Sequence, residues 1–137
     1  MKLFKRTTQR RSQRTGATAV EFSLTLPILL LFIFATFELG RGNMMMNTTE
    51  AAAYEAARVA IVPGATVAEA EAAAELILAT AGIEVSDFSI VPGNLDTASE
   101  SVAVTIDVSF AENSLFLPDF LESTRFVRTC ELNRENQ

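Results

Sequence analysis

A single carboxylate, Glu21, stands at the start of a long apolar run and is the residue of this chain best placed for chemistry. A charge at the edge of a membrane-length apolar segment is costly and usually functional. Gly16 precedes it by five residues in a stretch of small residues, GATA, which is typical of a processing site. Cleavage of the Gly16–Ala17 bond would create an α-amine at Ala17, four residues before Glu21. Residues at this spacing share one helix face, so the amine and the carboxylate could pair.

The partner of the Glu21 carboxylate decides its role. The Ala17 amine of the same chain would lie within reach, and in an assembly the carboxylate could instead reach the amine of a neighbouring subunit. Removing either partner of a buried ion pair costs about 3–5 kcal/mol, so such a pair would select the register between subunits. Taken alone, Glu21 also suits an ordinary interfacial position near a helix N-terminus, where its charge complements the helix dipole. Gly16 and the basic residues before it favour the assembly role.

Other chemistry finds little support in the sequence. The chain has no histidine, which excludes Ser–His and Cys–His catalytic pairs. Cys130 is the single cysteine and cannot form a disulfide within the chain. A buried strand position is its simplest interpretation, and an intermolecular disulfide is the less expected one. The carboxylates lack the spacing of a metal-binding loop, and there is no glycine-rich phosphate loop. We therefore expect no enzymatic activity, no cofactor and no metal site.

The charges divide the chain into a basic end and an acidic remainder. Six of the eleven lysines and arginines lie in residues 1–16, which contain no acidic residue, whereas all 17 acidic residues follow. Basic residues beside a membrane segment stay on the cytoplasmic side. Nucleic-acid binding is disfavoured, because the basic end matches no DNA-binding motif and an apolar segment follows it at once. The asymmetry predicts a cytoplasmic N-terminus and an extracytoplasmic C-terminal part.

The apolar run Phe22–Phe37 is close to the length of a membrane span. Its sixteen residues would rise about 24 Å as a helix, slightly less than a hydrocarbon core of about 30 Å. Flanking apolar residues extend it, so the predicted span is 22–41. Pro27 lies inside this span and is expected to kink the helix or melt it locally. Glu38 and Arg41, at i,i+3 spacing, are expected to pair at the membrane exit.

A cleaved secretory signal peptide is the main alternative interpretation of the basic end and the apolar run. Signal peptidase needs a small-x-small site after the apolar core, and the nearest candidate, at residues 40–42, is poor. The arginine pair at 10–11 lacks the apolar residues of a twin-arginine signal. Because the small residues Gly16 and Ala17 stand before the core, cleavage there would leave the span in the mature protein.

Residues 16–41, GATAVEFSLTLPILLLFIFATFELGR, resemble the N-terminal signature of the TadE-like pseudopilins of tight-adherence (Flp-type) pilus systems, minor relatives of type IV pilins. The similarity covers about residues 14–60, and the ordered set of features is specific although each feature alone is weak. The resemblance implies cleavage by a prepilin peptidase between Gly16 and Ala17. It also implies a role in pilus assembly rather than as the bulk pilin. The matching features are the basic leader, Gly16, Val20-Glu21-Phe22, Leu26-Pro27, the apolar run and Glu38-x-Gly40-Arg41.

The rest of the chain predicts a small α+β domain. The clearest strand is Ser101–Phe110, whose valines, isoleucine and phenylalanine alternate with polar or small residues and must face a core. The aromatic residues of the apolar linker 115–120 could cover that core or dock a partner, and core closure is the more common outcome. The predicted elements are a long helix over 17–62, a second helix from a Thr66–Glu69 capping box to about Ala81 with Gly82 as its C-cap, and strands at Ile83–Val91, Ser101–Phe110 and Ser123–Cys130.

Taken together, we expect a pilin-like α+β fold: a long N-terminal helix, membrane-spanning in its first half, and a short helix packed on an antiparallel sheet of about three strands. The expected organisation is a cleaved basic leader (1–16), the long helix (17–62) and an extracytoplasmic domain (63–137). The expected location is the inner membrane, as a single-pass protein. Its implied partners are other pilin-class subunits, the prepilin peptidase, the pilus assembly machinery and the lipid bilayer. An uncleaved single-pass protein with a ligand- or partner-binding domain and a secreted binding domain are the alternatives.

Overall fold

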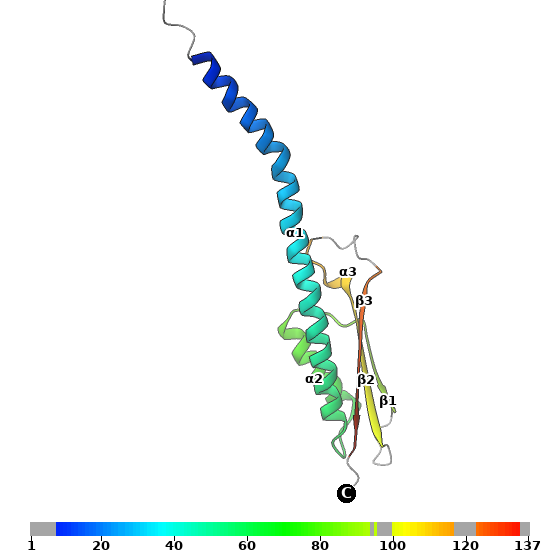
Figure 1. Cartoon of the computed structure of the whole chain (residues 1–137). Coiled ribbons are helices and arrows are strands. Elements are labelled where there is room, and N and C mark those ends of the chain that lie inside the picture. The colour runs from blue at the N-terminus through cyan, green and yellow to red at the C-terminus, as the bar shows by residue number, and fades with distance from the viewer. Residues whose placement is uncertain (1–7, 94, 96–99, 117–122, 135–137) are drawn as a thin grey trace, which may run out of the picture. The chain divides into compact units, whose positions relative to one another are not determined.

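The computed structural model describes residues 8–93, 95, 100–116 and 123–134. Along the chain these form α1 (Thr8–Ala60), α2 (Val67–Thr80), β1 (Asp87–Val91), β2 (Ser101–Ser109), the short α3 (Phe110–Asn113) and β3 (Arg125–Asn133). The long apolar helix, the shorter helix and the three-stranded antiparallel sheet confirm the predicted α+β class (Figure 1). The chain divides into two compact units between Phe37 and Glu38, so α1 contributes to both.

The N-terminal unit (1–37) holds the apolar part of α1. Large side chains such as Phe22, Leu31 and Phe37 are more than 60% exposed. Among the described residues, α1 is the one helix long and apolar enough to cross a membrane. The helix is not broken at Pro27, so the local melting expected there does not occur. It also begins at Thr8 rather than after residue 16, which places the Gly16–Ala17 bond inside the helix.

The C-terminal unit (38–137) is built on the second part of α1. Here one face of the helix consists of small side chains that are at most 1% exposed: Ala52, Ala53, Ala56, Ala57 and Ala60. Together with Ala70 and Ala74 of α2, they belong to the hydrophobic core of the described residues. Small side chains let neighbouring elements approach closely, since interaxial distances depend on the side chains at the contact. The helix ends at Ala60, two residues before the predicted Val62, and a turn follows.

The predicted capping box of α2 is formed, whereas the C-cap lies one residue before the predicted Gly82. The Thr66 backbone N–H donates to Glu69 Oε2 at 2.8 Å, and the Glu69 N–H donates to Thr66 Oγ1 at 3.3 Å, which completes the capping box. At the other end Gly82 has a φ of +60°, and the Ile83 N–H donates to the Leu78 carbonyl at 3.0 Å. The cap itself is Ala81, with Gly82 next to it in the left-handed conformation that this type of helix end requires.

The sheet has the order β1-β2-β3, with both neighbouring pairs antiparallel. The alternation predicted for β2 is confirmed, because Val102, Val104, Ile106 and Val108 are fully buried. The predicted strand boundaries were less accurate. β1 begins at Asp87 rather than Ile83. β2 ends at Ser109 rather than Phe110, because Phe110 is the first residue of α3. β3 runs over Arg125–Asn133 rather than Ser123–Cys130. The late start of β1 has a clear cause, since both backbone groups of Glu84 are bonded to the Asn113 side chain.

Candidate functional site

Gly16, Ala17 and Glu21 are all exposed on α1. A side chain added at Gly16 would meet no atom within 4 Å, so the peptide bond to Ala17 is sterically open. The backbone there is helical, and the amine that Glu21 would pair with does not exist before cleavage. In the part of the chain that the structure describes, the two ion pairs lie elsewhere, and neither involves Glu21.

The hydroxyl side chains within the apolar run bond to the helix itself. Ser23 Oγ donates to the Val20 carbonyl at 2.8 Å, and Thr36 Oγ1 donates to the Phe32 carbonyl at 2.8 Å. Thr25 Oγ1 donates to the Glu21 carbonyl at 3.1 Å. Polar groups in hydrocarbon must be satisfied internally, and these three hydroxyls meet that requirement. Glu21 is therefore the one strongly polar side chain of this region that still needs a partner outside its own turn.

Glu38 is buried, although it was expected at the membrane exit in a pair with Arg41. Its side chain is 4% exposed, and its Oε1 accepts a hydrogen bond from Ser114 Oγ. Oε2 is buried without a hydrogen-bond partner among the described residues. The predicted pair is not formed, because each of the two side chains is held by the C-terminal unit instead. This carboxylate fixes the segment after α3 to α1.

Arg41 holds the ends of two helices. Its Nη1 donates to the Ala81 carbonyl at 3.0 Å, and its Nη2 donates to the Gly82 carbonyl at 2.7 Å. Its Nε donates at 3.2 Å to the carbonyl of Asn113, which is the last residue of α3. Helix C-termini leave carbonyls without intrahelical donors, and a cation there also complements the helix dipole. We call these three contacts the Arg41 anchor. The flat, five-donor guanidinium suits this task better than an ammonium group.

Asn113 completes the anchor and was not identified from the sequence. The side chain is buried, and its Oδ1 accepts from the Glu84 N–H at 2.7 Å. Its Nδ2 donates to the carbonyls of Glu84 and Ser109, both at 3.0 Å. One amide thus joins α3, the segment before β1 and the end of β2. No local pattern signals this role, because an asparagine after a strand is ordinarily interpreted as a turn residue.

Gly42 lies against an aromatic pair, Phe110 of α3 and Phe126 of β3. A Cβ added there would stand 3.2 Å from Cε2 of Phe110 and 3.7 Å from Cζ of Phe126. The two rings meet edge to face, with centroids 6.1 Å apart. Gly40, two residues earlier, faces open space. The two glycines flanking Arg41 therefore have different roles, and only the second is required for packing.

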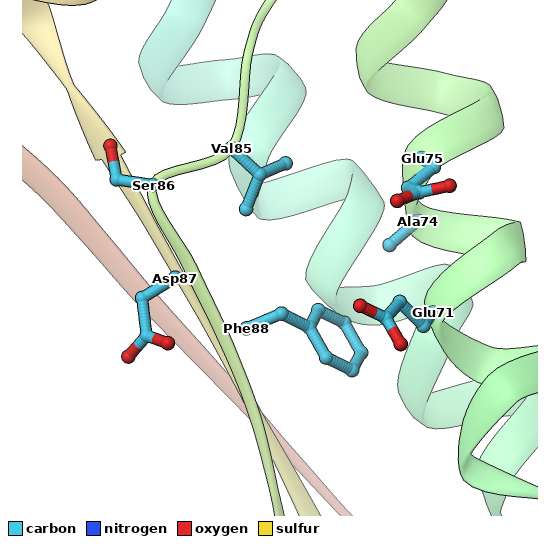
Figure 2. Close-up of a pocket in the computed structure, with 7 residues that line it drawn as sticks. All are labelled: Glu71, Ala74, Glu75, Val85, Ser86, Asp87 and Phe88. Carbon is cyan, nitrogen blue, oxygen red and sulfur yellow. The ribbon is translucent and has the colours of Figure 1, made fainter.

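A cavity of about 290 Å³ lies between α2 and β1 (Figure 2). In the close-up, Phe88 points from β1 toward Glu71 of α2, whereas Asp87 points away from the helix. The carboxylates around the cavity therefore do not converge on one point. Over the described ranges, no group of three or more His, Cys, Asp or Glu side chains is placed to hold a metal ion.

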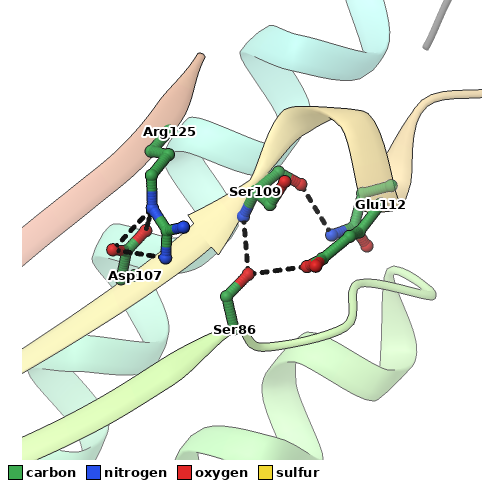
Figure 3. A network of polar contacts seen from close by, with 6 residues as sticks. Ser86, Asp107, Ser109, Glu112 and Arg125 are labelled. Carbon is green, nitrogen blue, oxygen red and sulfur yellow. Dashed lines mark hydrogen bonds and ion pairs between the residues drawn. The ribbon is translucent and has the colours of Figure 1, made fainter. Parts of the chain in front are cut away.

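Polar contacts of Ser86 and of Arg125 fix the end of β2 (Figure 3). Ser86 Oγ donates to Glu112 Oε2 at 2.7 Å and accepts from the Ser109 N–H at 3.0 Å. On β2 and β3, Arg125 pairs with Asp107 at 2.8 Å, and this hydrogen-bonded contact raises the pKa of the arginine. These contacts hold α3 and the edge strand in place around Asn113. They are structural contacts of the C-terminal unit.

Cys130 lies half-buried on β3, opposite Val104 of β2. Burial raises the pKa of its thiol, and the nearby Glu50 carboxylate acts in the same direction. A raised pKa lowers the thiolate fraction at neutral pH and with it the reactivity of the sulfur. Cys130 is a strand residue as predicted, but it is half-buried against the core rather than buried.

A comparison with protein-family models found one that matches residues 16–58, described as TadE-like protein. No curated protein and no solved structure matched the chain. The matched range covers Gly16, Ala17, Glu21, Glu38 and Arg41, and it ends two residues before α1 does. It does not extend over α2 or the sheet. The chain therefore carries the TadE-like signature over residues 16–58, which confirms the resemblance predicted from its sequence.

Proposed function

We propose that this protein is a membrane-anchored minor pilin, or pseudopilin, that acts without enzymatic activity in the assembly of a tight-adherence pilus or a related secretion apparatus. The TadE-like match supports pilus-associated function. The observation that carries the proposal is the change of burial along one unbroken helix. Phe22 and Phe37 are both 62% exposed, whereas Met45 and Ala56 are fully buried in the core. One helix thus joins a lipid- or partner-facing segment to a folded domain.

The orientation follows from the charges. Residues 1–16 carry six basic residues and would stay in the cytoplasm, and the C-terminal unit, which holds every acidic residue except Glu21, would lie outside the membrane. The serine and threonine hydroxyls of the apolar run are bonded within the helix, which suits a lipid environment. We place the protein in the inner membrane, with a single span over residues 22–41.

Processing after Gly16 by a prepilin peptidase is the next element of the proposal. The TadE-like match begins at Gly16, and the residue has open space around it. Because the bond to Ala17 is helical, the first turns of α1 would have to unwind before a peptidase could act. Helix ends fray most readily, and this bond lies within three turns of Thr8.

Cleavage would leave the Ala17 α-amine and the Glu21 carboxylate on one face of α1. The carboxylate has no ion-pair partner in the described chain, and an unpaired charge in hydrocarbon is expensive. We propose that Glu21 neutralises the Ala17 amine of another pilin-class subunit when the apolar helices assemble. The free-energy cost of burying the Glu21 carboxylate without a partner would then favour one register between subunits.

One observation favours the alternative of an uncleaved single-pass protein with a partner-binding domain. α1 runs without interruption from Thr8 through Gly16 and Ala17. In that case residues 1–16 would remain as a basic extension of the helix on the cytoplasmic side. The Arg41 anchor and the sheet would serve the same structural purpose in both cases.

N-terminal sequencing of the protein purified from membranes of pilus-forming cells distinguishes the two proposals. Processing predicts a mature chain that begins at Ala17, and Gly16→Val should accumulate at the precursor mass. Gly40→Val is the matched control, because Gly40 lies on the same helix and also faces open space; it should be processed normally. A wild-type chain that retains residues 1–16 would refute processing and support the alternative.

A further inference from the structure

Arg128 of β3 is a cation at the sheet edge whose charge meets no carboxylate in the described chain. Its Nη1 donates to the carbonyl of the adjacent Val127 at 3.0 Å, and it takes part in neither ion pair of the described residues. The other arginines of the C-terminal unit pair with carboxylates or donate to carbonyls at helix ends: Arg58, Arg125, Arg41 and Arg134. The half-buried Arg128 guanidinium therefore lacks the kind of partner that the others have.

The cavity between α2 and β1 has the opposite charge. Glu71 and Glu75 line it one helical turn apart and are exposed, and no lysine or arginine of the described residues lines it. Like charges at this spacing repel each other. Phe88 points from β1 toward Glu71, which sets an aromatic ring beside a carboxylate (Figure 2). An arginine suits these walls, because its guanidinium can stack on a ring while it pairs with a carboxylate.

Arg128 and the cavity lie at the same level of the sheet, on its opposite edges. Phe88 of β1 and Arg128 of β3 are both paired with Ile106 of β2, so the three form one row across the sheet. Ile106 is fully buried, which places this row on the face that packs against the core. A second copy displaced sideways, without a shift along the strands, would therefore bring its Phe88 next to Arg128 of the first copy.

The backbone of β3 has a free edge. Just beyond the two ends of the β2–β3 ladder, the Phe110 N–H donates to the Thr124 carbonyl at 2.9 Å, and the Arg134 N–H donates to the Glu100 carbonyl at 2.8 Å. Antiparallel ladders bond at alternate pairs, so the even-numbered residues of β3 bond to β2. The odd-numbered residues turn their N–H and carbonyl groups away from β2: Arg125, Val127, Thr129, Glu131 and Asn133. Among the described residues, the hydrogen bond that reaches these groups is the one from Arg128 to the Val127 carbonyl.

The same alternation gives β1 a free edge. The odd-numbered residues of β2 face β1, as the 3.0 Å hydrogen bond from the Ser86 N–H to the Asp107 carbonyl shows. The backbone groups of Phe88 and Ile90 therefore point away from the sheet. β1 and β3 run in the same direction, because both are antiparallel to β2. A strand edge with unpaired backbone groups is a template for another strand.

We propose that copies of this chain associate side by side through β3 of one copy and β1 of the next, with Arg128 of the first entering the α2–β1 cavity of the second. Thr129 then lies opposite Ser89 of the second copy, and the strands pair in parallel. The Val127 carbonyl exchanges Arg128 for a backbone N–H, that of Phe88 in the second copy. The freed guanidinium stacks on the same Phe88 and pairs with Glu71.

A side-by-side contact suits these edges better than a two-fold contact between two β3 strands. In the registers of greatest overlap, a two-fold contact would set Arg128 beside Arg128, Cys130 or Leu132 of the other copy, where no carboxylate meets it. It would also turn the α1 segments 38–60 of the two copies in opposite directions. The side-by-side contact keeps them in one direction. Because its two edges differ, further copies can add, and Pro92, which has no N–H, ends the pairing along β1.

Disulfide cross-linking tests the contact. Strands that pair lie about 4.8 Å apart, within the Cα separation of a disulfide, about 4.4–6.8 Å. Within one chain β2 separates Ser89 from Thr129, so the two positions can be bridged only between copies. Full-length Thr129→Cys and Ser89→Cys chains with different tags, each also carrying Cys130→Ser, are produced together, and their membranes are oxidised with copper phenanthroline. Ala72→Cys, at an exposed position of α2, replaces Ser89→Cys as the collision control.

We expect a disulfide-linked heterodimer of Thr129→Cys with Ser89→Cys on non-reducing gels. Thr129→Cys should give no dimer alone or with Ala72→Cys. A homodimer of Thr129→Cys would reveal two-fold pairing and overturn the proposal, as would the absence of the heterodimer. Val127→Cys with Asp87→Cys, the adjacent pair in the same register, replaces the first pair if either chain does not accumulate.

Charge reversal tests the entry of Arg128 into the cavity. Arg128→Glu in the Thr129→Cys chain should abolish the heterodimer, and Glu71→Arg in the Ser89→Cys chain should restore it. Arg58→Glu, which reverses an exposed charge of α1, is the matched control and should leave the yield unchanged. An undiminished heterodimer with Arg128→Glu would show that Arg128 does not enter the cavity. The contact uses only the C-terminal unit, so Gly16→Val should cross-link as well as wild type whether or not the chain is processed.

Discussion

Arg41 Nη2 donates a 2.7 Å hydrogen bond to the Gly82 carbonyl, 41 residues away, and so joins α1 to the end of α2. The same guanidinium reaches the Asn113 carbonyl at the end of α3. An arginine at the end of an apolar segment would ordinarily be assigned to the lipid headgroups. Here its donors are used by the protein, which makes this arginine of the TadE-like signature a folding element.

Arg41→Ala should destabilise the C-terminal unit by about 1.5–3 kcal/mol, because it removes charge-assisted hydrogen bonds to carbonyls that have no other described donor. Arg41→Lys should recover only part of the loss, since one ammonium cannot reproduce the planar fork. Urea unfolding of the full chain in detergent, followed by circular dichroism, measures the effect. Arg58→Ala, which removes the exposed ion pair with Glu55, is the control and should stay near wild type. Equal losses for Arg41→Ala and Arg58→Ala would contradict the anchor.

Glu38→Gln should be nearly neutral, whereas Glu38→Ala should cost about 1–3 kcal/mol. The glutamine keeps an acceptor for Ser114 Oγ and removes a buried charge whose second oxygen has no described partner. The alanine leaves the serine hydroxyl without its acceptor and leaves a void. The same unfolding experiment tests both variants. If glutamine costs as much as alanine, the negative charge itself is required, and an unseen cationic partner must be sought.

Gly42→Ala should be less stable than Gly40→Ala by about 1–3 kcal/mol. Both changes gain helix propensity, worth about 1 kcal/mol. At Gly42 the new methyl would press on the Phe110 ring at 3.2 Å, whereas at Gly40 it meets open space. Thermal unfolding of the two variants in parallel makes each the control for the other. Equal stabilities would show that the aromatic pair moves aside without cost.

Acidification should weaken α2 through Glu69. Its hydrogen bonds with Thr66, chiefly to the backbone N–H, lower its pKa from the ordinary value of 4.5. A lowered folded-state pKa gives stability that is present above 4.5 and is lost as the pH falls through the folded-state value. Between pH 7 and pH 3, the free energy of unfolding should therefore decrease more steeply for the wild type than for Glu69→Gln. Urea unfolding at a series of pH values measures this difference. Glu71→Gln, on the same helix but outside the capping box, should follow the wild-type curve.

The sequence predicted most elements of the fold because their signals are local. The capping box at Thr66–Glu69, the glycine after α2 and the alternation in β2 each depend on neighbouring residues, and all three are formed. The start of β1 could not be predicted in this way. It depends on Asn113, which lies 29 residues from Glu84 and takes both of its backbone groups. Such a contact exists only after the chain has folded.

In the candidate site, too, local patterns identified the residues but could not predict their tertiary contacts. Gly16, Ala17 and Glu21 were identified by pattern, and their roles remain predictions because those roles depend on a peptidase and on other subunits. Glu38 and Arg41 were correctly singled out but assigned to one another. At i,i+3 spacing they could meet, yet the unsatisfied carbonyls at Ala81 and Asn113 compete for the guanidinium. Local spacing cannot reveal acceptors that tertiary structure brings from 40 and 72 residues away.

The proposed role in assembly depends on Glu21, because pairing between subunits through its carboxylate would make the apolar helix an assembly element. The most direct measurement counts pili by electron microscopy on cells in which the gene is replaced by Glu21→Ala, with Glu50→Ala as an exposed carboxylate control on the same helix. Membrane levels and N-terminal processing are checked in both strains. We predict that Glu21→Ala is made and cleaved but yields few or no pili, while Glu50→Ala yields normal numbers. Wild-type pilus numbers with Glu21→Ala would contradict the claim.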